Sequence, residues 1–459
     1  MVSGRVADDA AWLKAMLAAE AGLARALERA GAAPAGAGAA VTAAAQAGDF
    51  GAEDLAELGR AATLTGNPVP GLARVLTRKV ATPAGKSAVH QGATSQDILD
   101  TAAMLLARDA LAAAEADLRA AATAVAGLAD RHRSTLMIGR TLLQQAVPTT
   151  FGVVAAGWLS GLDGAIEGLE YVRDKRLAVQ LGGAAGTLAS LGEHGARVKA
   201  LMAAELGLAD SPTPWHTERL RIIDVGTAAA RVTAALSAIA RDVTLLAQTE
   251  VGEVSEGAGA GPGQGGGADG APRRGGSSAM PNKNNPVASV VVLGCAKQAP
   301  GLLATLVASA EQEHQRAAGA WHAEWQPYGH LLELMVSAAA WARDLLVNLR
   351  VDRSRMAANL ADAGGLLLAE RVTALLRGSL GAPAAHDLVA VAAARSASSG
   401  IPLRDVLLAS PEIEGKLAAA GITADQVEQA LDPAGYLGVA QTFISDTLLA
   451  HATRNKGRS

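Results

Sequence analysis

The chain has 459 residues, of which half are apolar and 3% are aromatic, and its formal net charge is −4. At this length a single hydrophobic core stops growing, and many alanines with few aromatic residues suit packed helices better than sheets. The small charge, without a run of Lys or Arg, argues against nucleic acid as a partner. The composition therefore predicts an all-α protein of two or three structural units.

The sequence shows no pattern of a signal peptide or a membrane span, and it contains one cysteine. Charged residues interrupt the apolar positions of the first 20 residues, at Arg5, Asp8, Asp9, Lys14 and Glu20. This pattern does not fit the apolar core of a signal peptide, and no uncharged apolar stretch reaches the roughly 18 residues that span a bilayer. The single cysteine, Cys295, cannot form an internal disulfide. We therefore expect a cytoplasmic protein without a membrane partner.

An N-terminal helical domain is expected over residues 1–98. Its amphipathic helical patterns are short and are separated by Gly and Pro, for example at 33–36 and 66–68. From Leu99 onward the pattern lengthens, because apolar residues recur at spacings of three and four over about eight turns. This change indicates the first helix of a second domain.

A central domain of long helices is expected over residues 99–350. Further long patterns occur at about 144–180, 217–251, 285–317 and 328–350. Five long helices with Ala-rich faces can pack closely as one extended bundle. Shorter patterns broken by Gly and Pro follow, and they predict a third helical domain over 351–459.

A glycine-rich tract separates two of the long patterns. Half of the residues between Gly257 and Gly276 are Gly, and such tracts are typically surface linkers. Here the residues that follow, Gly276 to Pro286, read Gly-Ser-Ser-Ala-Met-Pro-Asn-Lys-Asn-Asn-Pro. They gather hydroxyl, amide and ammonium groups, which is hard to explain by packing alone. We therefore expect a mobile catalytic loop over 252–286.

The chemistry of this loop suits a small polycarboxylate substrate. When a proton joins or leaves the carbon beside a carboxylate, negative charge spreads onto the carboxylate oxygens. Preorganised hydrogen-bond donors and a fixed cation stabilise that charge best in a site closed to water. The loop therefore predicts proton transfer next to a carboxylate.

The loop resembles the signature of the fumarase/aspartase superfamily, Gly-Ser-Ser-x-Met-Pro-x-Lys-x-Asn-Pro, at every defined position. His90–Thr101 resembles the Thr-Ser carboxylate-binding turn of that superfamily, and Gly139–Gly152 is similar to its Gly-Arg-Thr-His stretch. The resemblance implies that the three regions meet in active sites shared between subunits. It also implies a homotetramer with a core of twenty helices.

Two departures from the superfamily pattern are informative. Leu142 follows Thr141, where fumarases and adenylosuccinate lyases carry His. The branch of bacterial 3-carboxy-cis,cis-muconate cycloisomerases also lacks that His, and 66–70, 148–152 and 324–327 resemble that branch. Gln145, however, stands where His is expected in the branch, so the second proton-transfer group is open.

The resemblance implies a cycloisomerase that lactonises 3-carboxy-cis,cis-muconate to a carboxymuconolactone. Such an isomerase belongs to aromatic compound catabolism, in the protocatechuate branch of the beta-ketoadipate pathway. The resemblance requires no cofactor and no metal. Three alternatives stay open: a lyase that releases fumarate from adenylosuccinate, argininosuccinate or another substituted succinate; a non-catalytic structural bundle; and a helical scaffold unrelated to the superfamily.

The resemblance also implies residue roles. Ser277 is expected to be catalytic and to carry the proton at the reacting carbon. The expected substrate-binding residues are Thr94, Ser95, His90, Arg140, Thr141, Gln144, Ser278, Met280, Lys283 and Asn285. Hydroxyl and N–H groups at a helix N-terminus bind anions, although Thr94 and Ser95 could equally form a plain helix cap.

Two other segments suggest chemistry that we set aside. Gln180–Thr187 lacks the glycine spacing of a dinucleotide loop, and the superfamily resemblance implies that it is a loop beside the active site. Glu311–His314 contains one Glu-x-x-His, whereas a di-metal bundle needs two. We expect Glu313, His314 and Arg316 to line a polar seam, and Trp321, His322 and Trp325 to serve packing or an interface.

Overall fold

The computed structural model describes residues 6–46, 49–257, 275–276, 280 and 283–456. Helices make up most of these residues, which confirms the predicted all-α class. The chain forms two compact units. Unit 1 comprises Met1–Arg119, Gly164–Ser237 and Val291–Arg343, and unit 2 comprises Ala120–Asp163, Ala238–Val290 and Asp344–Ser459. The expected division into domains 1–98, 99–350 and 351–459 remains a prediction.

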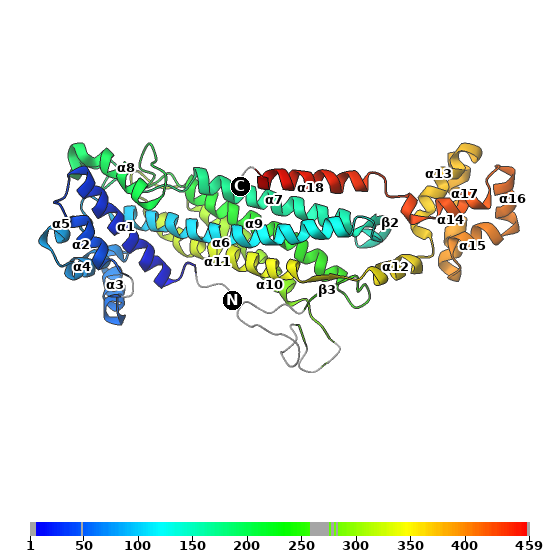
Figure 1. Cartoon of the computed structure of the whole chain (residues 1–459), viewed down its shortest axis with the longest axis horizontal. Coiled ribbons are helices and arrows are strands. Elements are labelled where there is room, and N and C mark those ends of the chain that lie inside the picture. The colour runs from blue at the N-terminus through cyan, green and yellow to red at the C-terminus, as the bar shows by residue number, and fades with distance from the viewer. Residues whose placement is uncertain (1–5, 47–48, 258–274, 277–279, 281–282, 457–459) are drawn as a thin grey trace. The chain divides into compact units, whose positions relative to one another are not determined.

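The N-terminal helices belong to unit 1 (Figure 1). They are α1 (Asp9–Ala30), α2 (Ala37–Ala44), α3 (Ala52–Thr65), α4 (Val69–Lys79) and α5 (Pro83–Ala88). The Asp8 side chain caps α1 by accepting the N–H of Ala11, and α1 ends at Gly31 with a φ of 79°. The expected breaks at 33–36 and 66–68 are confirmed.

The five long helices are confirmed. They are α6 (Ser95–Arg131), α7 (Phe151–Lys175), α9 (Leu220–Leu246), α10 (Val287–Ala308) and α11 (Ala320–Val347). The boundary between the two units falls inside them, so each unit contains a part of every long helix. Their buried faces are rich in Ala and Leu, as the three-and-four spacing requires.

Two of the expected helix ranges were too long. Residues 144–150 form a strand, β2 (Gln144–Thr150), which pairs antiparallel with β1 (Leu136–Thr141). Val147, Thr149 and Thr150 favour a strand, and Pro148 would break a helix interior. The helix expected over 285–317 ends at Ala308, and α11 already begins at Ala320.

The remaining elements complete the two units. In unit 1, η2 (Ala189–His194) leads into α8 (Gly195–Leu206), and α8 packs against α1. In unit 2, β3 (Val254–Glu256) pairs with β4 (Leu349–Val351). The other elements of unit 2 are α12 (Arg353–Asp362), η3 (Leu366–Leu368), α13 (Ala369–Leu380), α14 (Ala382–Ser399), α15 (Leu403–Ala409), α16 (Pro411–Ala419), α17 (Ala424–Ala430), η4 (Pro433–Gly435) and α18 (Ala440–Lys456).

Helices α13 to α17 lie together in Figure 1 and share a hydrophobic core of their own. Val372, Leu376, Leu403 and Val427 are completely buried in it. Helix α18 lies beside α7, where His451 bonds to Asp163 with an Nδ1 to Oδ1 distance of 2.9 Å.

Two helices are long and apolar enough to cross a membrane by length and composition alone, namely α9 and α10. Core helices of soluble proteins pass the same test. Half of the apolar window of α9 is buried in the chain, but only 22% of that of α10.

Candidate active site

The predicted carboxylate-binding turn lies in unit 1 at the start of α6. Helix α6 begins at Ser95, and the Asp97 carboxylate accepts the N–H of Thr94 at 2.9 Å. Thr94 and Ser95 are half-buried. The N–H groups at a helix N-terminus carry partial positive charge, so this turn has the right character for an anion.

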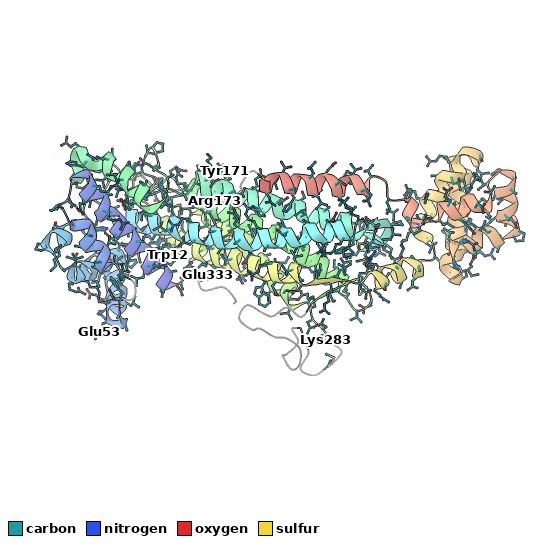
Figure 2. All side chains as sticks on the ribbon, viewed as in Figure 1. Trp12, Glu53, Tyr171, Arg173, Lys283 and Glu333 are labelled. Carbon is teal, nitrogen blue, oxygen red and sulfur yellow. The ribbon has the colours of Figure 1, made fainter. Side chains whose placement is uncertain are left out.

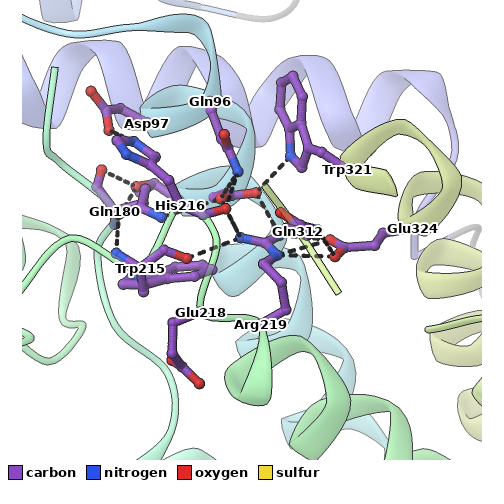
Figure 3. A network of polar contacts seen from close by, with 12 residues as sticks. Gln96, Asp97, Gln180, Trp215, His216, Glu218, Arg219, Gln312, Trp321 and Glu324 are labelled. Carbon is purple, nitrogen blue, oxygen red and sulfur yellow. Dashed lines mark hydrogen bonds and ion pairs between the residues drawn. The ribbon is translucent and has the colours of Figure 1, made fainter. Parts of the chain in front are cut away.

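Asp97 fixes the shape of this turn. Its side chain is completely buried and also accepts the N–H groups of Gly182 and Gly183, each at 2.9 Å. His216 completes the set, with 2.7 Å between its Nε2 and Asp97 Oδ1 (Figure 3). The turn is thereby tied to two segments that are distant in sequence.

Gly182 makes this close approach possible. A Cβ atom at Gly182 would lie 2.7 Å from both His216 Cε1 and Pro214 Cβ. This observation fits the interpretation of 180–187 as a loop whose missing side chains let the backbone come near.

A buried ion network lies directly behind the turn (Figure 3). The side chain of Arg219 is 1% exposed and contacts Asp100 at 2.7 Å and Glu324 at 2.6 Å. Gln96 donates to Asp100 at 3.1 Å and to the carbonyl of His216 at 2.8 Å. Burial raises the pKa of the Glu324 carboxyl above its usual value, although Arg219 opposes this rise. The network joins α6 and α11 to the residues that precede α9.

His90, at the other end of the turn, is held by a buried carboxylate. Glu20 accepts the His90 N–H at 3.0 Å and contacts its Nδ1 at 2.7 Å. The backbone of His90 has a φ of 57°, a strained value for a residue with a side chain. Burial alone would lower the pKa of His90, but the hydrogen bond and charge of Glu20, with the charge of Asp97, raise it above 6.5.

The Gly-Arg-Thr region forms the β1–β2 hairpin of unit 2. Arg140 makes a bidentate pair with Glu253, at 2.9 Å and 2.8 Å. Glu253 is completely buried and also accepts from Asn359 at 2.8 Å. In this arrangement the guanidinium of Arg140 anchors the hairpin, and its role toward substrate remains a prediction. Thr141 and Gln144 are exposed partners across the hairpin.

The tip of the hairpin is apolar and strained. Leu142 and Leu143 have φ values of 51° and 63°, and they are 97% and 75% exposed. Two consecutive positive φ values define the turn type that normally carries Asn-Gly. Leu142 therefore presents a hydrocarbon side chain to the surroundings. Gln145 is also exposed.

The signature loop is described only in part. Ser277 and Ser278 lie outside the described residues, as does most of the glycine-rich tract expected to be mobile. Asn285 donates to the Gly275 carbonyl from its N–H at 2.8 Å and from Nδ2 at 2.9 Å. Met280 and Lys283 are exposed, and Figure 2 shows the Lys283 side chain. Their predicted contacts with substrate remain predictions.

A polar cavity of about 640 Å³ borders this loop within unit 2. We call it the ribbon cavity, because it follows the β3–β4 ribbon. Its lining includes Gln248, Ser255, Glu256, Asn284, Asn285, Arg350, Asp352 and Arg353.

The Glu-x-x-His segment lies in the connection between α10 and α11. Because residues 309–319 are not helical, Glu311 and His314 do not occupy one helix face. Glu313 accepts the N–H of Ala318 at 3.0 Å. Arg316 donates to Gln96 at 3.1 Å and so belongs to the network behind the turn.

The predicted packing role of the α11 aromatic residues is consistent with their contacts. Trp321 is buried, stacks edge-on against Trp325 and donates to Asp100 at 3.1 Å. His322 contacts the Gly66 carbonyl at 3.1 Å.

The contacts of His216 and Arg219 were not predicted from the sequence. Their partners Asp97 and Asp100 lie 119 residues away, and neither residue belongs to a motif that we weighed. The available signal was the pair of carboxylates one helical turn apart, just after the Thr-Ser turn.

The long helices, the hydroxyl-bearing turn and the Lys-Asn loop define a helical lyase-type enzyme for small carboxylate substrates. Residues 3–301 match the family model described as lyase, and residues 365–447 match the model described as adenylosuccinate lyase C-terminus. The chain belongs to the fumarase/aspartase superfamily of lyases.

Relatives resemble the chain along nearly its full length. It is 45% identical to a nitrosuccinate lyase of Streptomyces davaonensis, over 95% of this chain and 90% of that protein. It is 42% identical to a 3-carboxy-cis,cis-muconate cycloisomerase of Pseudomonas aeruginosa, over 97% of this chain and 93% of that protein. The crystal structure of 3-carboxy-cis,cis-muconate lactonizing enzyme from Pseudomonas putida matches with a TM-score of 0.86 and 36% identity, covering 97% of this chain and 96% of that one.

Proposed function

We propose that this chain is a cycloisomerase that converts 3-carboxy-cis,cis-muconate to a carboxymuconolactone. The observation that carries the proposal is the full-length similarity to cycloisomerases combined with a hydrocarbon residue, Leu142, at the hairpin tip. The signature loop and the Thr94–Ser95 turn supply the groups that a polycarboxylate needs.

Leu142 bears on which group the substrate can release. In the reverse reaction the ring oxygen of the lactone leaves as a carboxylate, whose conjugate acid has a pKa of about 4. Such a group leaves at neutral pH without being protonated. An amine or hydroxide leaving group needs a general acid, which a leucine side chain cannot provide. Adenylosuccinate and argininosuccinate, which release nitrogen leaving groups, therefore fit this chain less well.

The proposed reaction is an intramolecular addition. One substrate carboxylate oxygen bonds to an alkene carbon, and the electron pair of the double bond moves to the adjacent carbon and its carboxylate. The Ser277 hydroxyl then gives its proton to that carbon, so the trianion becomes a dianionic lactone, and the serine oxygen regains a proton from solvent before the next turnover. Lys283 and the Thr94–Ser95 turn hold carboxylates and stabilise the charge that develops.

The test follows the loss of the conjugated diene by ultraviolet absorbance. Purified chain should consume 3-carboxy-cis,cis-muconate, and Ser277→Ala should fold but lose more than about a thousandfold in kcat. Near-normal turnover by that variant would remove Ser277 from the mechanism. No turnover on any carboxylate tested would favour a non-catalytic bundle.

A second candidate is elimination from a succinate that carries a nitro group, because a nitrosuccinate lyase is 45% identical to this chain. A base would take the proton beside a carboxylate, the C–N bond would break, and nitrite and fumarate would form. Nitrite is a weak base like a carboxylate, so Leu142 fits this reaction as well. Nitrite release from nitrosuccinate, measured beside diene loss, separates the two candidates.

We also propose a cytoplasmic homotetramer with shared active sites. Helix α10 leaves most of its apolar window uncovered, with Val290 and Val307 56% and 52% exposed. Copies of the same chain would bury this face and account for its composition. Light scattering on the full chain tests the assembly.

A further inference from the structure

The charges that line the ribbon cavity are not equivalent. Formally, Arg350 and Arg353 balance Glu256 and Asp352. Both carboxylates, however, are engaged at helix N-termini. Glu256 accepts the N–H groups of Ala288 and Ser289, at 2.9 Å and 2.8 Å, and the hydroxyl of Ser289 at 2.8 Å.

Asp352 has the same function at α12. It is the N-cap of α12 and accepts the N–H of Arg355 at 2.8 Å. A helix N-terminus carries about half a positive charge, so each capping carboxylate is partly neutralised by its own helix. The negative side of the cavity is therefore partly compensated.

The two guanidinium groups have no such partners. Arg350 and Arg353 are exposed, and within the part of the chain that the structure describes neither forms an ion pair. The charge of Arg353 also reaches His132, whose pKa is lowered mainly by burial and further by Arg353 and Arg131. The uncompensated charge of the ribbon cavity is thus positive.

The cavity also adjoins the signature loop. Asn285, whose amide is fixed on Gly275, lines it together with Asn284. The hydroxyl of Ser255 and the amide of Gln248 add hydrogen-bond donors on the opposite segments. A volume of about 640 Å³ accommodates an organic acid of substrate size.

We propose that the ribbon cavity is a subsite for one carboxylate of the substrate, held by Arg350 and Arg353. This inference rests on the proposed function and refines it. Succinate-type substrates and 3-carboxy-cis,cis-muconate share two carboxylates. The muconate has a third carboxylate, and the two arginines would bind it. Guanidinium forks bind carboxylates in bidentate geometry, which suits selection by carboxylate number.

The test measures binding rather than turnover, by calorimetry on the full chain at fixed chloride concentration. The probes are propane-1,2,3-tricarboxylate and glutarate, which are saturated and do not react. Arg350→Gln and Arg353→Gln should each weaken tricarboxylate binding about tenfold and leave glutarate binding within about twofold. Arg377→Gln is the matched control, since Arg377 is an exposed arginine of unit 2 outside this cavity.

Each outcome decides between specific alternatives. Equal losses for both probes, or the same loss in Arg377→Gln, would mean general charge attraction and would overturn the subsite. Unchanged tricarboxylate binding in both cavity variants would overturn it as well. If the chain consumes the diene but neither arginine replacement weakens tricarboxylate binding, the subsite is rejected and the proposed reaction is retained. A selective arginine effect in a chain without diene turnover rejects the proposed reaction but retains the subsite.

Discussion

At the scale of single residues, Asp97 fixes the shape of the Thr94–Ser95 turn, where we propose that a substrate carboxylate binds. Four donors converge on its buried oxygens, and three of them are backbone N–H groups that have little freedom to move. His216 is the one side chain among them and is 4% exposed, so it positions the turn rather than touching the substrate.

Replacing His216 should therefore change binding more than chemistry. We expect His216→Phe to raise KM about tenfold and change kcat by less than about threefold, because a carboxylate handle is held alike in ground and transition states. His216→Gln keeps a donor and should recover most of the loss. Steady-state kinetics on both variants provide the measurement.

A similar pair elsewhere serves as the control for this experiment. His451 contacts Asp163 at 2.9 Å in unit 2 and is also largely buried. His451→Phe should lower the free energy of unfolding without moving KM. If both His variants raise KM equally, the effect of His216 is general destabilisation.

His90 should make stability depend on pH. Its folded-state pKa lies above the ordinary value of 6.5, so its contribution is fully present below that value and is lost as pH rises through the folded-state pKa. His90→Asn, which tolerates a positive φ, should therefore destabilise the chain more at about pH 5.5 than at about pH 8.5. Urea unfolding at both pH values measures the difference.

The control is the exposed His386, whose side chain is 74% exposed. His386→Asn should show no difference between the two pH values. A larger effect of His90→Asn at high pH would contradict the assignment of Glu20 as the group that holds the imidazolium.

At the scale of elements, the β1–β2 hairpin was not predicted from the sequence, whereas the long helices were. The long helices could be predicted because their apolar spacing is local and repeats many times. The strand over 144–150 was missed although Pro148 and its β-branched neighbours argue against a helix there. Its pairing with 136–141 and the anchor between Arg140 and Glu253, which are 113 residues apart, leave no mark in the local pattern. The candidate site divides in the same way: the motifs were readable, but the contacts that hold them were not.

The Leu142–Leu143 turn gives a prediction for this element. Replacing both residues by Asn-Gly should raise the free energy of unfolding by about 1–2 kcal/mol, because that pair suits the two positive φ values. If Leu142 faces the substrate, the same change lowers kcat/KM. Denaturant titration and kinetics on one preparation report both effects.

An exposed leucine in ordinary geometry provides the comparison. Leu64 is 86% exposed on α3, and Leu64→Gln removes hydrocarbon without relieving strain. It should leave the free energy of unfolding within about 0.5 kcal/mol. An equal gain in both variants would attribute the effect to lost surface hydrocarbon.

At the scale of the whole molecule, the Thr94–Ser95 turn and the signature loop belong to different compact units, unit 1 and unit 2. That active sites are shared between subunits is implied by the superfamily resemblance and could not be predicted from composition. The similarity to relatives over nearly the full length supports the same family for both units.

Mixing inactive variants tests shared sites directly. Thr94→Ala and Ser277→Ala are each expected to be nearly inactive. If one site takes its residues from different copies, unfolding and refolding the two variants together should restore a measurable part of the activity. Refolding each variant alone controls for spontaneous recovery, and no gain in the mixture would place both residues in one copy.

The chain is held by hydrogen bonds on both sides of the glycine-rich tract, at Gly257 and at Gly275. Gly257 donates to the Asn348 carbonyl at 3.0 Å, and a Cβ atom there would lie 2.4 Å from that oxygen. At the other end, Asn285 is bonded to Gly275. The entropy of closing a flexible connection grows only slowly with residue number. Insertions or deletions between Gly257 and Gly275 should therefore leave the hydrogen bonds of Gly257 and Asn285 in place.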